Sequence, residues 1–183
     1  MSTLAHIPES DMKEILMLKD RLSLLESQGQ CQESFMEYVR YIWDGFIEGE
    51  HHRLIADKLT EVAQGKCKRL IVNMPPRHTK SEFASVYFPS WVMGLNPDMK
   101  IMQTTHTADL SIRFGRKVRN LMDTDEYKRM FSDVSLAADS KSAGRWQTSQ
   151  GGEYFAAGVG GAITGRGADL LIIDDPHSEQ DAL

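Results

Sequence analysis

Cysteine is scarce in this sequence, which holds only Cys31 and Cys67. Their spacing is not that of metal ligands, so we interpret them as reduced thiols of an intracellular protein. Long apolar runs are missing too, since none approaches the ~20 residues of a membrane span. The first residues, Met1 to His6, lack the basic and apolar regions of a signal peptide. We therefore expect a protein that is neither secreted nor embedded in a membrane.

Positive charge is also in short supply, because 21 lysines and arginines stand against 26 aspartates and glutamates, for a net charge of −5. This balance argues against a bulk electrostatic grip on DNA but leaves room for a local basic surface. Of the 183 residues, 41% are hydrophobic and 26% are charged. These proportions are typical of one soluble globular domain that is long enough to bury a real core.

Glycine is absent from the stretch around which the chain is organised. Leu70 to Val72 form a short apolar run that predicts a buried strand. Pro75 and Pro76 then stop it, because proline supplies no N–H to a sheet ladder. Helical character returns over residues 81–88. This order is the layout of a phosphate-binding loop, in which backbone N–H groups and a helix N-terminus attract phosphate.

Lys80 and Ser81 stand at the end of that loop. In such loops a lysine reaches the outer phosphates, and a Ser or Thr hydroxyl can hold Mg²⁺. The usual pattern, G-x-x-x-x-G-K-[ST], is not met, because Met74 and Thr79 occupy its two glycine positions. Taken alone, the stretch is more simply interpreted as a helix that happens to begin with Lys-Ser.

A second apolar run, residues 169–173, is followed by Asp174 and Asp175. One carboxylate at a strand end can orient the water shell of Mg²⁺, and the next can polarise the attacking water. Ligands of α/β sheets bind at the carboxyl ends of parallel strands. Lys80 and Asp174 are 94 positions apart (174 − 80), which leaves room for intervening elements. Together the two stretches predict a Mg²⁺-nucleotide site.

The segment from Pro75 to Ser81 resembles the altered Walker A loop of the large terminase subunits of tailed phages, the motors that pump DNA into capsids. The resemblance extends to residues 91–97, 158–169 and 170–176, and it covers roughly residues 35–182 with the motifs in the family's order. This sequence departs from the family at Thr79, where glycine is usual. A glutamate is common in the family where Asp175 stands.

The resemblance implies a P-loop ATPase of the ASCE type, an α/β fold with a mostly parallel sheet flanked by helices. Residues 1–65 would form a helical segment packed on the ATPase core, and residues 66–183 that core. The implied ligands are ATP and Mg²⁺. The residues expected to bind the nucleotide are Pro76, Arg77, His78, Thr79, Lys80 and Ser81, with His52 as a further candidate in the region that lies against the adenine.

The resemblance also assigns roles to single residues. Lys80 would hold the β- and γ-phosphates, Ser81 and Asp174 would hold Mg²⁺, and Asp175 would position or activate the water. Residues 158–167 contain five of the 14 glycines, which is typical of a flexible surface loop. In some terminase motors an arginine at this place reaches the ATP of a neighbouring subunit, which makes Arg166 a catalytic candidate.

Arg77 is a competing candidate that would act on the nucleotide of its own chain. Helix 108–122 carries Arg113, Arg116, Lys117 and Arg119, which could face DNA phosphates, although a solvated helix face is the simpler interpretation.

By resemblance, ATP hydrolysis would drive double-stranded DNA into a procapsid. The expected partners are DNA, the terminase small subunit, the portal and procapsid, and further copies in a homo-oligomeric ring, in the cytoplasm of the infected bacterial host. The sequence stops at Leu183, before the family's next strand and nuclease domain. We therefore expect an incomplete sheet with an exposed edge and no DNA cleavage.

Three other functions stay open. A helicase-like DNA-dependent ATPase would share both motifs, and a small-molecule kinase would also use Lys80 and Asp174. The non-enzymatic alternative is a truncated piece that binds nucleotide, or only a partner subunit, without turnover.

Periodicity and turn residues predict the remaining elements. The expected helices span residues 9–27 (with Ser10 as N-cap), 32–47, 51–65 and 108–122 (with Thr107 as N-cap). Pro89 should kink or end the helix that begins at Ser81. Residues 100–105 should form a strand, and residues 145–149 and 153–157 a β-hairpin. Trp91 and Met93 should lie in the core.

Overall fold

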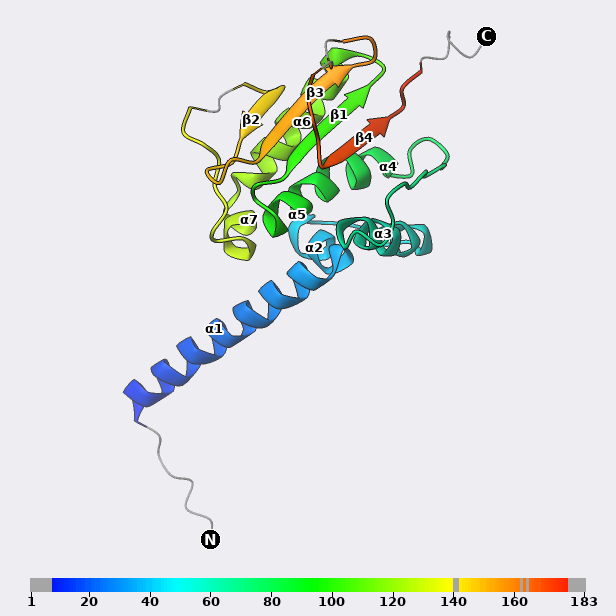
Figure 1. Cartoon of the computed structure of the whole chain (residues 1–183). Coiled ribbons are helices and arrows are strands. Elements are labelled where there is room, and N and C mark those ends of the chain that lie inside the picture. Colours follow the sequence, from blue (N-terminus) through cyan, green and yellow to red (C-terminus); the bar gives the residue numbers. More distant parts are fainter. Residues whose placement is uncertain (1–7, 140–141, 162, 164, 178–183) are drawn as a thin grey trace.

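The computed structural model describes residues 8–139, 142–161, 163 and 165–177. A four-stranded sheet packs against helices, and one long helix extends away from this body (Figure 1). The α/β class expected from the sequence is confirmed. In the described part of the chain, no helix is both long enough and apolar enough to cross a membrane.

The sheet has the strand order β2-β3-β1-β4. β1 (Lys100–Thr105) pairs in parallel with β3 (Glu153–Gly158) on one side and with β4 (Leu170–Asp174) on the other. β2 (Arg145–Gln147) pairs antiparallel with β3, so the predicted hairpin is confirmed. The sheet is therefore mixed, and the arrowheads of β1, β3 and β4 point toward the same edge (Figure 1).

The strand predicted over Leu70 to Val72 is wrong. This segment is not part of the sheet, and Ile71 is 84% exposed. A strand needs a neighbour for its backbone hydrogen bonds. The free edge of β4 faces the segment, but a groove separates the two and no ladder forms between them. The apolar run therefore marks the segment correctly as partly buried chain but does not bring it within hydrogen-bonding distance of a neighbouring strand.

Several of the predicted helix ends are also wrong. α1 (Glu9–Glu33) begins at Glu9 as predicted, with Pro8 rather than Ser10 at its N-cap, but it continues through Gly29, and the helix predicted over residues 32–47 is shorter at both ends. The break falls at Ser34, whose hydroxyl accepts the Glu37 N–H and so starts α2 (Phe35–Ile42).

The two later helices follow the sequence more closely. α3 spans Glu50–Ala63. α6 (Ala108–Met122) begins at the predicted cap, where the hydroxyl of Thr107 accepts the Leu110 N–H. It is followed by α7 (Asp125–Met130). α6 covers β1 and β3 and thereby connects two parallel strands.

The phosphate-loop lysine opens one helical run made of α4 (Lys80–Glu82), the π-helical segment η1 (Phe83–Tyr87) and α5 (Phe88–Leu95). Pro89 was expected to kink or end this run, yet it continues to Leu95. The N–H of Phe88 bonds to the carbonyl of Phe83, five residues back. This widened turn accommodates the proline that follows, because proline has no N–H to offer the preceding turn.

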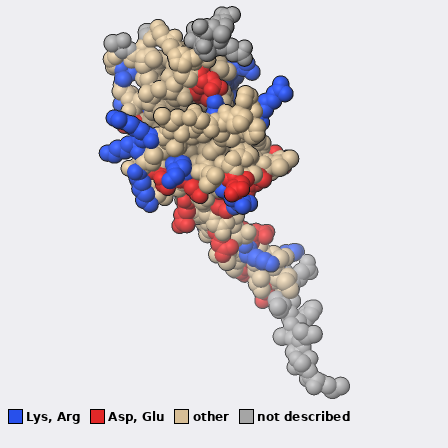
Figure 2. Space-filling model, turned by 90° about the vertical axis from the view of Figure 1, so that its right-hand side faces the viewer, with Lys and Arg blue, Asp and Glu red and all other residues tan. Residues whose placement is uncertain are grey.

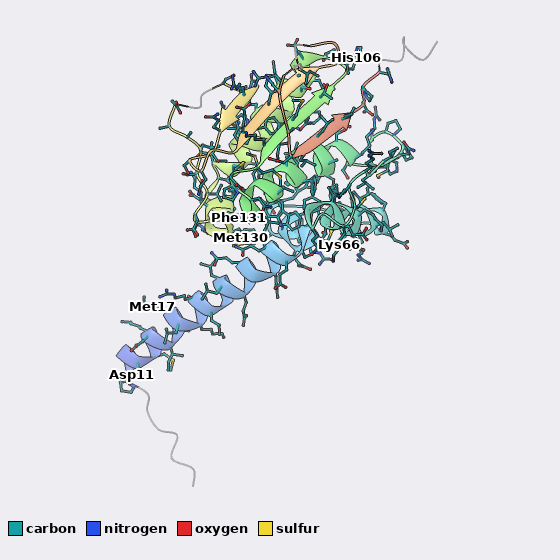
Figure 3. The ribbon with its side chains drawn as sticks, in the orientation of Figure 1. Asp11, Met17, Lys66, His106, Met130 and Phe131 are labelled. Carbon is teal, nitrogen blue, oxygen red and sulfur yellow. The ribbon has the colours of Figure 1, made fainter. Side chains whose placement is uncertain are left out.

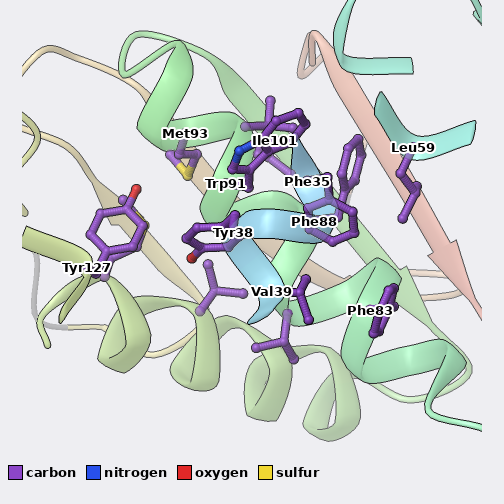
Figure 4. Packing of buried hydrophobic residues seen from close by; sticks show 14 of the residues in the cluster. Phe35, Tyr38, Val39, Leu59, Phe83, Phe88, Trp91, Met93, Ile101 and Tyr127 are labelled. Carbon is purple, nitrogen blue, oxygen red and sulfur yellow. The ribbon is translucent and has the colours of Figure 1, made fainter. Parts of the chain in front are cut away.

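An aromatic cluster joins α2 to this helical run (Figure 4). The ring of Phe35 meets Phe83 and Phe88 edge-on, with centroids 5.7 and 5.6 Å apart. Trp91 and Met93 are buried as predicted, and the Trp91 indole donates to the carbonyl of Cys31. The packing fixes the start of the helical run, and with it the phosphate loop, against the sheet.

Candidate functional site

Lys80 and the two aspartates meet at the carboxyl edge of the sheet. Nζ of Lys80 lies 2.6 Å from Oδ1 of Asp175 and 4.0 Å from Oδ1 of Asp174. Lys80 and Asp175 are 95 positions apart in the sequence. The helical run supplies the lysine and β4 the acids, so the constellation expected from two separate stretches exists in space.

The two aspartates have different environments. Asp174 ends β4 and is 6% exposed, and it accepts a hydrogen bond of 3.0 Å from the hydroxyl of Ser85. The side chain of Asp175 is 64% exposed. Its backbone has a φ of 43°, and its carbonyl accepts the N–H of His106, which lies at the end of β1 (Figure 3). One carboxylate is therefore fixed and the other projects toward solvent, which suits two different tasks.

The loop between Pro75 and Lys80 has two residues in the left-handed region, Arg77 at φ 64° and Thr79 at φ 61°. This region favours glycine, because other residues carry a Cβ that crowds the carbonyl. Thr79 stands where the phosphate-loop pattern has glycine, and its backbone adopts the conformation that a glycine would take. Nδ1 of His78 lies 2.8 Å from the Pro76 carbonyl and closes the loop.

His52 holds this strained position from α3. Its Nδ1 accepts the Gly49 N–H at 2.9 Å, so its Nε2 carries the proton and donates to Oγ1 of Thr79 at 2.6 Å. The Thr79 hydroxyl in turn donates to the carbonyl of His78. The sequence-based interpretation placed His52 near an adenine. The structure places it in contact with Thr79, within the segment predicted to be a phosphate loop.

The His52 ring is buried between aromatic side chains. Phe46 meets it edge-on and Phe83 stacks on it, each with centroids 4.9 Å apart. Burial and then the neighbouring His51 lower the pKa of His52, and His78 acts in the same direction against the opposing charge of Glu48. The neutral ring is favoured, and only the neutral ring can accept the Gly49 N–H.

A groove of about 940 Å³ separates β4 from the segment that was predicted as a strand. Residues 67–73 form one wall and residues 168–176 the other, with Ala84, Phe88 and Val92 between them. Lys80, Asp174 and Asp175 also line this groove. A hollow of this size that combines apolar walls with a few converging charges is typical of a small-molecule site.

The two arginine candidates lie in different places. Arg77 is exposed within the phosphate loop. Arg166 lies away from it, because its guanidinium bonds to Glu153 at 3.1 Å and covers the Phe155 ring at 4.1 Å. Glu153 begins β3, at the opposite edge of the sheet from Lys80. The structure therefore does not bring Arg166 to the site of its own chain.

The carboxylate of Glu153 pairs with two arginines, Arg145 and Arg166. Burial acts to raise its pKa, but hydrogen bonds from Arg145 and Gln147 and the charge of Arg166 outweigh burial, so the pKa of Glu153 is lowered. The ionised carboxylate thus holds Arg166 in this conformation.

Sequence reasoning missed one residue of the site, Ser85, and one contact between two residues that it did name, His52 and Thr79. Ser85 lies one helical turn after Ser81 and reaches Asp174, and the spacing of four residues was the available indication. The link from His52 to Thr79 had no indication in the sequence, because it joins α3 to a loop 27 positions away.

Within the described residues, no group of three or more His, Cys, Asp or Glu side chains could hold a metal ion. Comparison with protein-family models, curated proteins and solved structures finds no match to this chain. The interpretation of the site therefore depends on its geometry and on the resemblance of its motifs.

Proposed function

We propose that this chain binds a nucleoside triphosphate, ATP, with Mg²⁺ at the loop ending in Lys80 and hydrolyses it. The observation that carries the proposal is the convergence of Lys80 on Asp174 and Asp175 at the carboxyl edge of a sheet. A lysine that faces two carboxylates at a strand end suits a nucleotide site, because the lysine can bind the phosphates and a carboxylate can bind the metal ion between them.

The surroundings of each residue indicate the role that we propose for it. Lys80 would leave Asp175 and bind the outer phosphates, while the backbone N–H groups of residues 77–79 contact the same oxygens. Asp175, exposed and released by Lys80, would orient the attacking water and accept its proton. Arg77 lies in the loop and would bind phosphate, and Arg166 would serve a neighbouring chain.

The donor set fits Mg²⁺, which prefers one or two carboxylates completed by hydroxyl, water and phosphate oxygens. Ser85 uses Oδ2 of Asp174, which leaves Oδ1 toward Lys80 and the groove. Asp174 and the hydroxyl of Ser81 would hold the ion, whose positive charge offsets the negative charge of the phosphates.

We further propose that the hydrolysis serves a viral terminase motor. Support comes from the order of the motifs from Pro75 to Asp175 and from the exposed cations Arg113, Arg116 and Lys117 of α6. The chain would then act on double-stranded DNA in the cytoplasm of an infected bacterium. Its partners would be a small terminase subunit, a portal and procapsid, and other copies of itself in a ring.

Calorimetry with Mg-ATP tests the site. We expect binding by the wild type and a loss of at least about tenfold in affinity for Lys80→Ala, because the lysine supplies a charge-assisted contact to the phosphates. Lys58→Ala is the matched control, since Lys58 is exposed and pairs with Glu61 on α3. Absence of binding by the folded wild type, or equal binding by both variants, would refute the proposal.

Binding without turnover is the second candidate. It is favoured by the ion pair that engages Asp175 with Lys80 and by the position of Leu70 to Val72 outside the sheet. Phosphate release measured on the same samples separates the two functions. Stimulation of that release by free duplex or single-stranded DNA would favour a helicase-like ATPase over a packaging motor.

A further inference from the structure

The first part of α1 stands clear of the rest of the chain (Figures 1 and 3). Its contacts with the body lie at its end, where Gln28 and Gln32 donate to the carbonyls of Arg129 and Met130. Figure 3 shows Met17 far from Met130. A helix that projects into solvent receives no support from a core, and isolated helices of this length are marginally stable in water.

Four large apolar side chains line one side of this projecting helix. Ile15, Leu18, Leu22 and Leu25 are spaced by three, four and three residues, and they are 49%, 59%, 57% and 55% exposed. This is the spacing of the a and d positions of a coiled coil, with Ile15 and Leu22 at a and Leu18 and Leu25 at d. We call these four residues the α1 seam.

Charged residues flank the α1 seam in a complementary order. Glu14 and Arg21 occupy g positions, and Lys19 and Glu26 occupy e positions. In a parallel pair each g residue faces the e residue five positions later in the partner. Glu14 then meets Lys19 of a second copy, and Arg21 meets Glu26, so both contacts are attractive. Figure 2 shows charges of both signs along the projecting helix, with uncharged residues between them.

An antiparallel pair that uses the same a and d residues lacks this complementarity. It would place Lys19 against Lys19 and Arg21 against Arg21, since e then faces e and g faces g. Like charges in these positions repel each other. The charges therefore select both the partner, a second copy of this chain, and its direction.

We propose that α1 pairs with the α1 of a second copy as a parallel two-stranded coiled coil through the α1 seam. The pairing covers apolar side chains that the body leaves exposed. It involves none of the residues of the candidate nucleotide site, so it stands independently of the proposed ATPase.

Contacts between α1 and the body set where the coiled coil ends but leave the α1 seam accessible. The next d position is Gln32, which bonds to Met130 of its own chain, so the α1 seam ends near Gly29. Three residues near the end of α1 face the body, namely Gln28, Cys31 and Gln32. At 3.6 residues per turn, the mean of their directions lies about a quarter turn from the α1 seam. The two bodies can therefore lie on opposite sides of the paired helices.

The other exposed apolar residues of α1 form no comparable line. Met12 and Leu16 are 44% and 52% exposed, but Lys19 and Ser23 follow them on that side of the helix. Met17 and Leu24 are 73% and 39% exposed, but Asp20 and Arg21 lie between them. A seam of two heptads is short, so the dimer should be weak, with a dissociation constant on the order of micromolar or above.

Sedimentation over a range of protein concentrations tests the pairing. We expect a reversible monomer–dimer equilibrium for the wild type and a weakening on the order of tenfold or more for Leu22→Ser, which removes two apolar contacts from the seam. Met17→Ser is the control and should leave the equilibrium unchanged. Since both residues project into solvent, neither variant should unfold the body, which circular dichroism verifies. A wild type that stays monomeric throughout, or equal effects of the two variants, would overturn the proposal.

Charge reversal tests the direction. Lys19→Glu sets two glutamates against each other in the parallel dimer and should weaken it roughly tenfold, whereas the double variant Glu14→Lys with Lys19→Glu should restore it. In a Cys67→Ser background, Leu25→Cys should form a disulfide between the two copies, because a parallel pair aligns identical d residues. A dimer whose strength Lys19→Glu leaves unchanged, together with no disulfide from Leu25→Cys, would show the antiparallel pair instead, because position 19 then faces itself and one like-charge pair replaces another.

Discussion

Nε2 of His52 lies 2.6 Å from Oγ1 of Thr79, so a buried side chain of α3 holds a left-handed residue of the predicted phosphate loop. The left-handed backbone costs a threonine about 1–2 kcal/mol relative to a right-handed one. A hydrogen bond contributes about 1 kcal/mol in return, and more where its loss leaves a buried donor unpaired. The contact thus explains how a threonine is tolerated where phosphate loops have glycine.

Substitutions at Thr79 separate the cost of the left-handed backbone from the contribution of the hydrogen bond to His52. Thr79→Val keeps the shape of the β-branched side chain but leaves the His52 N–H unpaired, so it should lower the free energy of unfolding by about 1–3 kcal/mol. Thr79→Gly relieves the backbone while losing the bond, so its change should be smaller. Urea denaturation measures both. Equal stability of Thr79→Val and the control Thr79→Ser would show that the hydrogen bond contributes nothing.

The stability of the loop should fall in acid because the pKa of His52 is lowered in the folded state. The unfolded chain then binds the proton more readily, so this contribution is fully present above the unfolded pKa of about 6.5 and is lost as the pH falls through the folded value. Protonation also removes the acceptor of the Gly49 N–H.

We therefore expect the stability difference between the wild type and His52→Gln to shrink between pH 7.5 and pH 5. Denaturation midpoints at both pH values measure the difference. The glutamine variant serves as the reference because every other histidine is the same in the two proteins. A difference that is independent of pH would exclude His52 as the titrating group.

The two aspartates should lose different functions when each is replaced by asparagine. Asp175→Asn should bind Mg-ATP but release phosphate about 10²–10⁴ times more slowly, since general-base catalysis contributes that much. Asp174→Asn should instead reduce the Mg²⁺ dependence of ATP binding, because Asp174 is the buried carboxylate that Ser85 orients. Calorimetry and phosphate release distinguish the outcomes. Identical profiles for the two variants would contradict the separate roles.

Among the described glycines of the glycine-rich segment, Gly158 has the tightest surroundings. A Cβ at Gly158 would lie 2.5 Å from the backbone nitrogen of Ala108, at the start of α6. Gly158→Ala should therefore cost about 2 kcal/mol or more, because backbone on both sides must move.

Gly167→Ala is the matched control, since a Cβ there meets nothing within 4 Å, and it should change stability by less than about 0.5 kcal/mol. Thermal or urea unfolding measures both variants. A Gly158→Ala variant as stable as the control would mean that β3 and α6 approach each other less closely than the structure shows.

The sequence by itself determined the local elements whose signals lie within a few residues. The cap at Thr107, the hairpin of β2 and β3, the strands β1 and β4, and the buried Trp91 follow from side-chain period, turn residues and capping groups, which act locally. The candidate acids and lysine were also visible, because each stands directly after a strand or at the start of a helix.

Tertiary structure decided the rest. Leu70 to Val72 have the composition of a strand but form no ladder with the free edge of β4, because pairing depends on how distant segments pack. The sequence also gives no indication that His52 would hold Thr79, or that Glu153 would hold Arg166 at the opposite edge of the sheet. Such contacts join residues across the fold. Their geometry is fixed only when helices and sheet pack, because packing sets which side chains meet.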